Sequence, residues 1–188
     1  MVTSSPMTGS GGRATSLATA MAMLVVAALS VAAARAEPGW TFDRDTGCRV
    51  WDDNPSVGWS VTWSGPCVNG MGHGRGVVQL YDRAGIAESR YDGDLRAGRL
   101  HGYGIYTWRN GQRYDGQLRE GNFHGRGAMT WPNGDRYEGQ WADDLAHGFG
   151  VKTTASGQTF GGQWTKGCFR HGERWAVVRR TAAQCGFR

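Results

Sequence analysis

The 188-residue sequence has five prolines, two lysines and a single long apolar run, and these shortages exclude several classes of protein. So few prolines exclude a collagen-like chain and a proline-rich linker. The lysines, Lys152 and Lys166, lie in no phosphate-binding loop, and no His-Glu-x-x-His sequence occurs. The segment 58–62 lacks the second glycine of a nucleophile elbow. We therefore predict that the chain is not an enzyme and that it uses no cofactor.

Glycine and aromatic residues are abundant instead. Glycine accounts for 31 residues and tryptophan for nine, and this glycine content is more than twice the usual share of about 7%. Hydrophobic residues make up 39% of the chain, which argues against extensive disorder. Glycine and aromatics with little aliphatic bulk favour β-hairpins and tight turns over a helical bundle.

The first 36 residues have the layout of a secretory signal peptide. Arg13 precedes an uncharged run from Leu17 to Ala34, and Ala34-Arg35-Ala36 fits a small-x-small cleavage site. We predict cleavage after Ala36 and export to a periplasmic or extracellular location. The alternative is an uncleaved membrane anchor, because the run is close to the shortest length that spans a bilayer.

All four cysteines lie beyond the predicted cleavage site. An even number in an exported chain favours two disulfides, although four cysteines allow three pairings and free buried thiols are the alternative. The pairs Cys48–Cys67 and Cys168–Cys185 would each close a short loop at one end of the chain, and each would stabilise the fold by about 2–4 kcal/mol.

A 23-residue repeat organises most of the remaining sequence. Large aromatic residues recur at this spacing, with glycine two positions later and His-Gly ten positions later in the first three units. These positions, which we interpret as structural, are Tyr91, Gly93, His101, Gly102, Tyr114, Gly116, His124, Gly125, Tyr137, Gly139, His147, Gly148, Phe160 and Gly162. A degenerate unit precedes them near Trp63, and in the last unit His171-Gly172 comes one position late.

Alternation within each unit predicts two short antiparallel strands. Tyr114, Gly116 and Leu118 alternate with polar residues, and Asn110-Gly111 and Asn133-Gly134 separate such runs. Asn-Gly is a strong hairpin signal, because both central residues of a type I′ turn need a positive φ. A lone hairpin is marginal in water, so we expect neighbouring units to stack and to bury one another's aromatic residues.

The pattern Tyr-x-Gly-x-Leu/Trp-x-x-Gly-x-x-His-Gly-x-Gly resembles the MORN repeat (membrane occupation and recognition nexus). Residues 91–104 and 114–127 match it fully, whereas 137–150 have Asp144 in place of a glycine. The resemblance implies an all-β fold, an elongated single-layer twisted sheet of consecutive antiparallel hairpins. It also implies a scaffold for protein contacts, dimerisation or acidic lipid headgroups.

We accordingly divide the chain into four segments. Residues 1–36 are the signal peptide, 37–62 an N-terminal cap, 63–178 the array, and 179–188 a basic C-terminal cap or tail. The five units begin near residues 63, 91, 114, 137 and 160, and we expect a disulfide to stabilise each end cap.

Two side-chain patterns suggest sites, and both have a structural alternative. Equivalent histidines in neighbouring units would lie about 10 Å apart, too far to share one metal ion, so we predict no metal site. Arg90, Arg113 and Arg136 share a strand face with carboxylates, which favours weak ion pairs over an arginine ladder for phosphates.

The candidate partner surface combines aromatic residues of the array with arginines of the C-terminal end. The structural alternative is that the aromatic residues form the core and the arginines belong to a capping strand. Residues 160–188 carry six basic groups and one acidic group. The surface consists of Tyr106, Trp108, Trp131, Arg174, Arg179 and Arg180. We predict an exported, non-enzymatic scaffold that binds a protein partner, and the alternative is binding to anionic lipid or glycan. We also predict homodimerisation through edge strands and no nucleic-acid binding.

Overall fold

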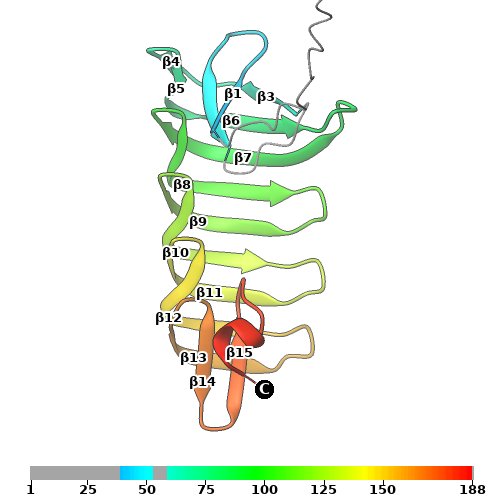
Figure 1. Ribbon diagram of the computed structural model, residues 1–188, viewed down its shortest axis with the longest axis vertical. Coiled ribbons are helices and arrows are strands. Elements are labelled where there is room, and N and C mark those ends of the chain that lie inside the picture. Colours follow the sequence, from blue (N-terminus) through cyan, green and yellow to red (C-terminus); the bar gives the residue numbers. More distant parts are fainter. Residues whose placement is uncertain (1–38, 53–58, 188) are drawn as a thin grey trace, which may run out of the picture. The chain divides into compact units, whose positions relative to one another are not determined.

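A computed structural model describes residues 39–52 and 59–187, and it confirms the all-β fold of consecutive antiparallel hairpins (Figure 1). Nine strands form one sheet in the order β13-β12-β11-β10-β9-β8-β7-β6-β3, and each of them pairs antiparallel with its neighbours. Their bounds are β3 Ser60–Trp63, β6 Gly74–Tyr81, β7 Ala87–Arg96, β8 Arg99–Trp108, β9 Arg113–Arg119, β10 Asn122–Thr130, β11 Arg136–Ala142, β12 Leu145–Thr153 and β13 Thr159–Trp164. The predicted signal peptide and its cleavage site lie outside the described residues.

The sheet has an inner face, which carries the repeat tyrosines, and an outer face, which carries the arginines that precede them. Tyr91, Tyr114 and Tyr137 are fully buried. The Tyr114 ring lies over the paired glycines Gly116 and Gly127, where an added Cβ would approach its hydroxyl oxygen to 2.7 and 2.4 Å. Each repeat tyrosine also donates a hydrogen bond to the carbonyl oxygen three residues later, at 2.7–3.1 Å. The repeat positions therefore build the core.

Two kinds of turn alternate along the array, and the predicted turn type at Asn-Gly is wrong. Gly111 has a positive φ, whereas Asn110 does not. Gly111 donates to the Trp108 carbonyl and Trp108 donates to the Gln112 carbonyl, both at 2.9 Å, so the loop is longer than a two-residue turn. Such a loop absorbs the strand twist with one left-handed residue instead of two.

The tight turns with two positive-φ residues lie at the opposite ends of the strands. They are Ala97-Gly98, Glu120-Gly121, Asp143-Asp144 and Lys166-Gly167. The second residue of each turn donates its N–H to a carbonyl of the preceding unit, as Gly121 does to Leu100 at 2.9 Å. Asp144, which departs from the glycine pattern, keeps this bond to Phe123 and also accepts the Phe123 N–H on Oδ1 at 2.9 Å. These bonds join successive hairpins.

The N-terminal cap is a four-stranded sheet in the order β1-β2-β5-β4, with β1 (Gly39–Phe42), β2 (Arg49–Asp52), β4 (Cys67–Val68) and β5 (Met71–Gly72). β4 and β5 fall within the range 63–178 that we assigned to the array, so the cap extends beyond residue 62. The predicted disulfide Cys48–Cys67 is confirmed. Residues 60–62, which we assigned to the cap, belong instead to β3 of the main sheet, because Val61 pairs with Leu80 of β6. Buried Asp43 accepts the Trp63 N–H at 2.9 Å and thereby ties the cap to this edge strand.

The C-terminal cap ends the array. β14 (Cys168–His171) leaves the main sheet and pairs with β15 (Arg174–Val177), followed by a 3₁₀ helix η1 (Ala183–Cys185). The fifth unit is therefore an incomplete hairpin, in which a single bridge joins Thr165 and Cys168. The predicted disulfide Cys168–Cys185 is confirmed, and Phe169 packs on Trp164 with ring centroids 5.2 Å apart.

Candidate functional site

The outer face of the array displays regular rows of side chains that run across the strands. One row alternates carboxylates of the first strand of each hairpin with apolar side chains of the second, for example Asp115 beside Ile105 and Ala128. The neighbouring row alternates arginine with threonine, for example Arg113 between Thr107 and Thr130. Because strands are about 4.8 Å apart, each row presents closely spaced groups of alternating chemistry.

The arginines of the outer face pair with carboxylates two residues further along the same strand. Arg90 lies 3.8 Å from Asp92 and Arg113 lies 2.6 Å from Asp115, and Arg136 contacts Glu138 in the same way. The arginine side chains are 44–53% exposed, so each pair contributes about 0–1 kcal/mol. Their charges are balanced locally.

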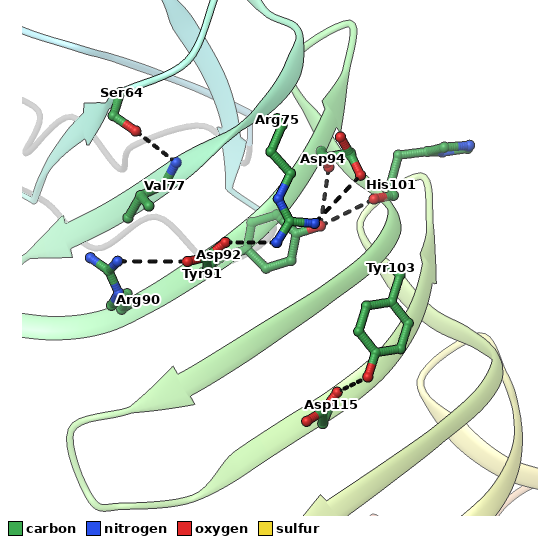
Figure 2. A network of polar contacts seen from close by, with 10 residues as sticks. All are labelled: Ser64, Arg75, Val77, Arg90, Tyr91, Asp92, Asp94, His101, Tyr103 and Asp115. Carbon is green, nitrogen blue, oxygen red and sulfur yellow. Dashed lines mark hydrogen bonds and ion pairs between the residues drawn. The ribbon is translucent and has the colours of Figure 1, made fainter.

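Figure 2 shows this polar network at the start of the array. Arg75 of β6 reaches across to Asp92 at 3.0 Å and to Asp94 at 4.0 Å. The Tyr103 hydroxyl of β8 donates to Asp115 of β9, the first strand of the following unit. The outer-face carboxylates are therefore shared between arginines and a tyrosine.

Asp115 accepts hydrogen bonds from both Tyr103 and Arg113. Burial alone would raise its pKa, but the hydrogen bonds from Tyr103 and Arg113 outweigh burial and hold the pKa of Asp115 below its usual value. The same hydrogen bond raises the pKa of the Tyr103 phenol, because it favours the protonated donor. Both groups therefore stay in their hydrogen-bonded form near neutral pH, which fixes the exposed Tyr103 ring.

A hollow of about 670 Å³ lies over β9–β12 on this face. Tyr103 and Phe149 border it at either end, and their side chains are 55% and 72% exposed. Arg113, Arg126 and Glu138 also line it. Val151, beside Glu138 in the register, is 44% exposed. An exposed apolar surface rimmed by paired charges is typical of an interaction site.

Tyr103 and Phe149 were not among the predicted partner residues. Both occupy the position immediately after His-Gly, which holds Arg75, Tyr103, Arg126 and Phe149 in successive units. The other marked positions of the pattern barely change from unit to unit. A variable residue at a repeated exposed position is the signal that would have identified them.

The predicted partner residues are divided between different places. Tyr106, Trp108 and Trp131 are partly buried against the core. Arg174 donates to the Thr159 carbonyl and lies 5.2 Å from the Phe160 ring centroid. Arg179 lies 5.1 Å from the Phe123 ring centroid, and the Arg180 stem packs against Gly167. Tyr106, Trp108 and Arg179 line one inner pocket, whereas the other three do not join them.

Three of the histidines, His101, His124 and His147, occupy bends in β8, β10 and β12. The glycine that follows each of them has a φ of 62–67°. His101 Nδ1 lies 3.8 Å from Glu120. Within residues 39–52 and 59–187, no three histidine, cysteine or acidic side chains gather as metal ligands. No helix in the same part of the chain is long and apolar enough to cross a membrane.

Comparison with protein families agrees with the repeat geometry. The MORN repeat family matches residues 91–113, 114–136 and 137–159, three consecutive units of the array. No curated protein matches the chain. MORN repeats are typically non-catalytic modules that bind proteins or membrane lipids. With three adjoining matches and the hairpin geometry of each unit, residues 91–159 are three consecutive MORN repeats.

Proposed function

We propose that the chain is an exported, non-enzymatic scaffold that binds a protein partner through the outer face of β8–β12. The exposed pair Tyr103 and Phe149, which borders the 670 Å³ hollow, carries this proposal. Large aromatic rings contribute most of the binding energy at protein interfaces, particularly when polar groups surround them. The apolar side chains of Val151 and Ile105 extend the same surface.

Electrostatics favour a protein over an anionic membrane as the partner. Residues 91–159 carry eight basic and eight acidic groups, and the outer-face arginines are paired with carboxylates. Adsorption to anionic lipid needs an excess of cations. At the C-terminal end, Arg174 and Arg179 rest on different aromatic rings and do not gather into one basic patch.

The two disulfides support the proposed export. All four cysteines are paired, as Cys48–Cys67 and Cys168–Cys185. Structural disulfides persist in oxidising compartments and are rare in the cytosol. This agrees with a signal peptide over residues 1–36, and mass determination of the exported protein would test cleavage after Ala36.

Affinity capture from cell-envelope extract tests the proposed surface. The purified protein, Tyr103→Ala/Phe149→Ala and the matched control Phe42→Ala would be compared in low and high salt. Phe42 is 59% exposed but lies on β1, away from the outer face. We expect a discrete protein to bind the parent and the control in both salts and to be lost with the double variant.

Two results would overturn the proposal. One is equal capture by the double variant, which would place binding elsewhere. The other is binding to anionic phospholipid vesicles that high salt abolishes and that the double variant retains, because this would indicate an electrostatic lipid surface.

A further inference from the structure

A pocket of about 320 Å³ lies on the inner side of the sheet. Trp51 of β2 and Trp108 of β8 line it, together with Phe123 of β10. Asp144 from the turn after β11 and Arg179 from the C-terminal cap complete it. Ligand pockets range from about 300 to 1,000 Å³, so this volume suits a small ligand or one terminal unit of a larger one.

Three aromatic rings form a continuous wall of this pocket. The centroids of Tyr106 and Trp108 are 4.4 Å apart, and those of Trp108 and Phe123 are 6.0 Å apart with the rings almost perpendicular. A hydrogen bond of 2.8 Å between the Tyr106 and Ser89 hydroxyls fixes the Tyr106 ring. Trp108 at the centre is only partly buried, so its ring offers a preformed stacking surface, whereas Phe123 is buried and stacks on Tyr114.

Charged groups stand beside this aromatic wall. The Arg179 guanidinium lies 5.1 Å from the Phe123 centroid, and among the described residues no carboxylate comes within ion-pair distance of it. Arg179 has a φ of 56°, a left-handed backbone conformation that is unfavourable for a non-glycine residue. Asp144 accepts the Phe123 N–H on Oδ1 alone, which leaves Oδ2 for a further hydrogen bond.

We propose that this inner pocket binds a neutral saccharide. The C–H face of a pyranose ring is apolar and stacks on aromatic rings, whereas its hydroxyls donate to carboxylates and accept from a guanidinium. The lining contains two aspartates, Asp52 and Asp144, and one arginine, Arg179, so the pocket has no cationic excess to attract an anionic sugar or a phosphate. The charged residues equally disfavour an alkyl chain. The pocket is separate from the outer face, so the two proposals stand or fall independently.

Titration with neutral trisaccharides of glucose, mannose and N-acetylglucosamine tests the inference, with tryptophan fluorescence and calorimetry as readouts. We expect one-to-one binding of at least one of them. Loss of a hydrogen bond from a charged group weakens binding about tenfold or more, and we expect this of Arg179→Gln. Trp108→Ala should weaken binding by about tenfold through lost stacking.

Matched controls separate recognition from folding. Arg170→Gln and Trp175→Ala change exposed residues of β14 and β15 that do not line the pocket, and both should bind as the parent does. If Trp108→Ala lowers the melting temperature, the affinity of Arg179→Gln, which changes an exposed residue, tests the proposal instead. Absence of binding at about 10 mM of each trisaccharide, unchanged affinity of Arg179→Gln, or preference for a galacturonate trimer would overturn the proposal.

Discussion

The two faces of the main sheet differ in how strongly packing restricts their residues. On the inner face, a tyrosine over a pair of glycines recurs in the units that begin at Tyr91, Tyr114 and Tyr137. On the outer face, the position after His-Gly differs between units and holds, for example, Arg75, Tyr103 and Phe149. Close packing restricts what the inner face accepts. Solvent exposure removes this restriction, so differences between units gather on the outer face and can serve recognition.

The largest expected contrast is between two tyrosines of opposite faces. Tyr114 is fully buried and donates a hydrogen bond to Gln117, whereas Tyr103 is 55% exposed. Tyr114→Ala should lower the free energy of unfolding by about 3–5 kcal/mol, as other large-to-small core substitutions do. Tyr103→Ala should change it by less than about 0.5 kcal/mol. Equal losses in urea unfolding would contradict the assignment of the two faces.

A pair of glycines sharpens the comparison. An added Cβ at Gly116 would lie 2.4 Å from the Gly127 Cα, whereas at Gly161 its nearest neighbour would be Val151 Cγ2 at 3.5 Å. Gly116→Ala should destabilise the fold by about 1–3 kcal/mol, because the obstructing atoms belong to the backbone. Gly161→Ala, measured by the same thermal unfolding, should be close to neutral. A Gly116→Ala variant with the parent's melting temperature would rule out the glycine pairing across β9 and β10.

The smallest expected contrast is between a buried and a partly exposed carboxylate. Burial alone would raise the pKa of Asp43, but N–H groups of Trp63, Asp45 and Thr46 outweigh it and lower the pKa. The ionised Asp43 therefore makes its full contribution to the free energy of unfolding above the pKa of the unfolded state, about 3.9. This contribution is lost as the pH falls through the pKa of the folded state. Asp43→Asn should cost about 1–2 kcal/mol at neutral pH and flatten this acid slope.

Asp115→Asn is the outer-face counterpart. The pKa of Asp115 is also lowered, so its contribution has the same sign, but its partner Arg113 is exposed and the loss should stay below about 1 kcal/mol. Urea unfolding of both variants between neutral and acidic pH measures the difference. A steeper loss for Asp115→Asn would show that the outer-face pairs, not the cap, set the acid stability.

The repeat was readable from the sequence because burial imposes it. Tyr114, Gly116 and Leu118 sit at period 2 on one strand and return every 23 residues, so strands, hairpins and their order followed directly. The two observed cysteine pairs, which close short loops at either end, were one of three pairings that the sequence allowed. The turn type at Asn110-Gly111 did not follow from the sequence, because the lengths of the adjoining strands decide whether two or three residues form the loop.

The candidate sites were less accessible to sequence reasoning. Trp108 and Arg179 are 71 positions apart and meet in one pocket only because the C-terminal cap returns to the inner face. Phe149 occupies the position after His-Gly, where the residue varies between units, but this variation does not by itself show whether the ring is exposed or buried. The strand register decides that difference, because it turns Phe149 outward beside Gln163.

The sequence alone determined the repeating core, since each unit must bury the same tyrosine over the same pair of glycines to form its hairpin. Only the tertiary structure decided where the array stops and what its ends cover. β14 leaves the sheet to pair with β15, and the caps then bring Trp51 and Arg179 together with Trp108. The physical reason is locality: a hairpin is set by neighbouring residues, whereas a pocket depends on contacts between distant segments that no repeat encodes.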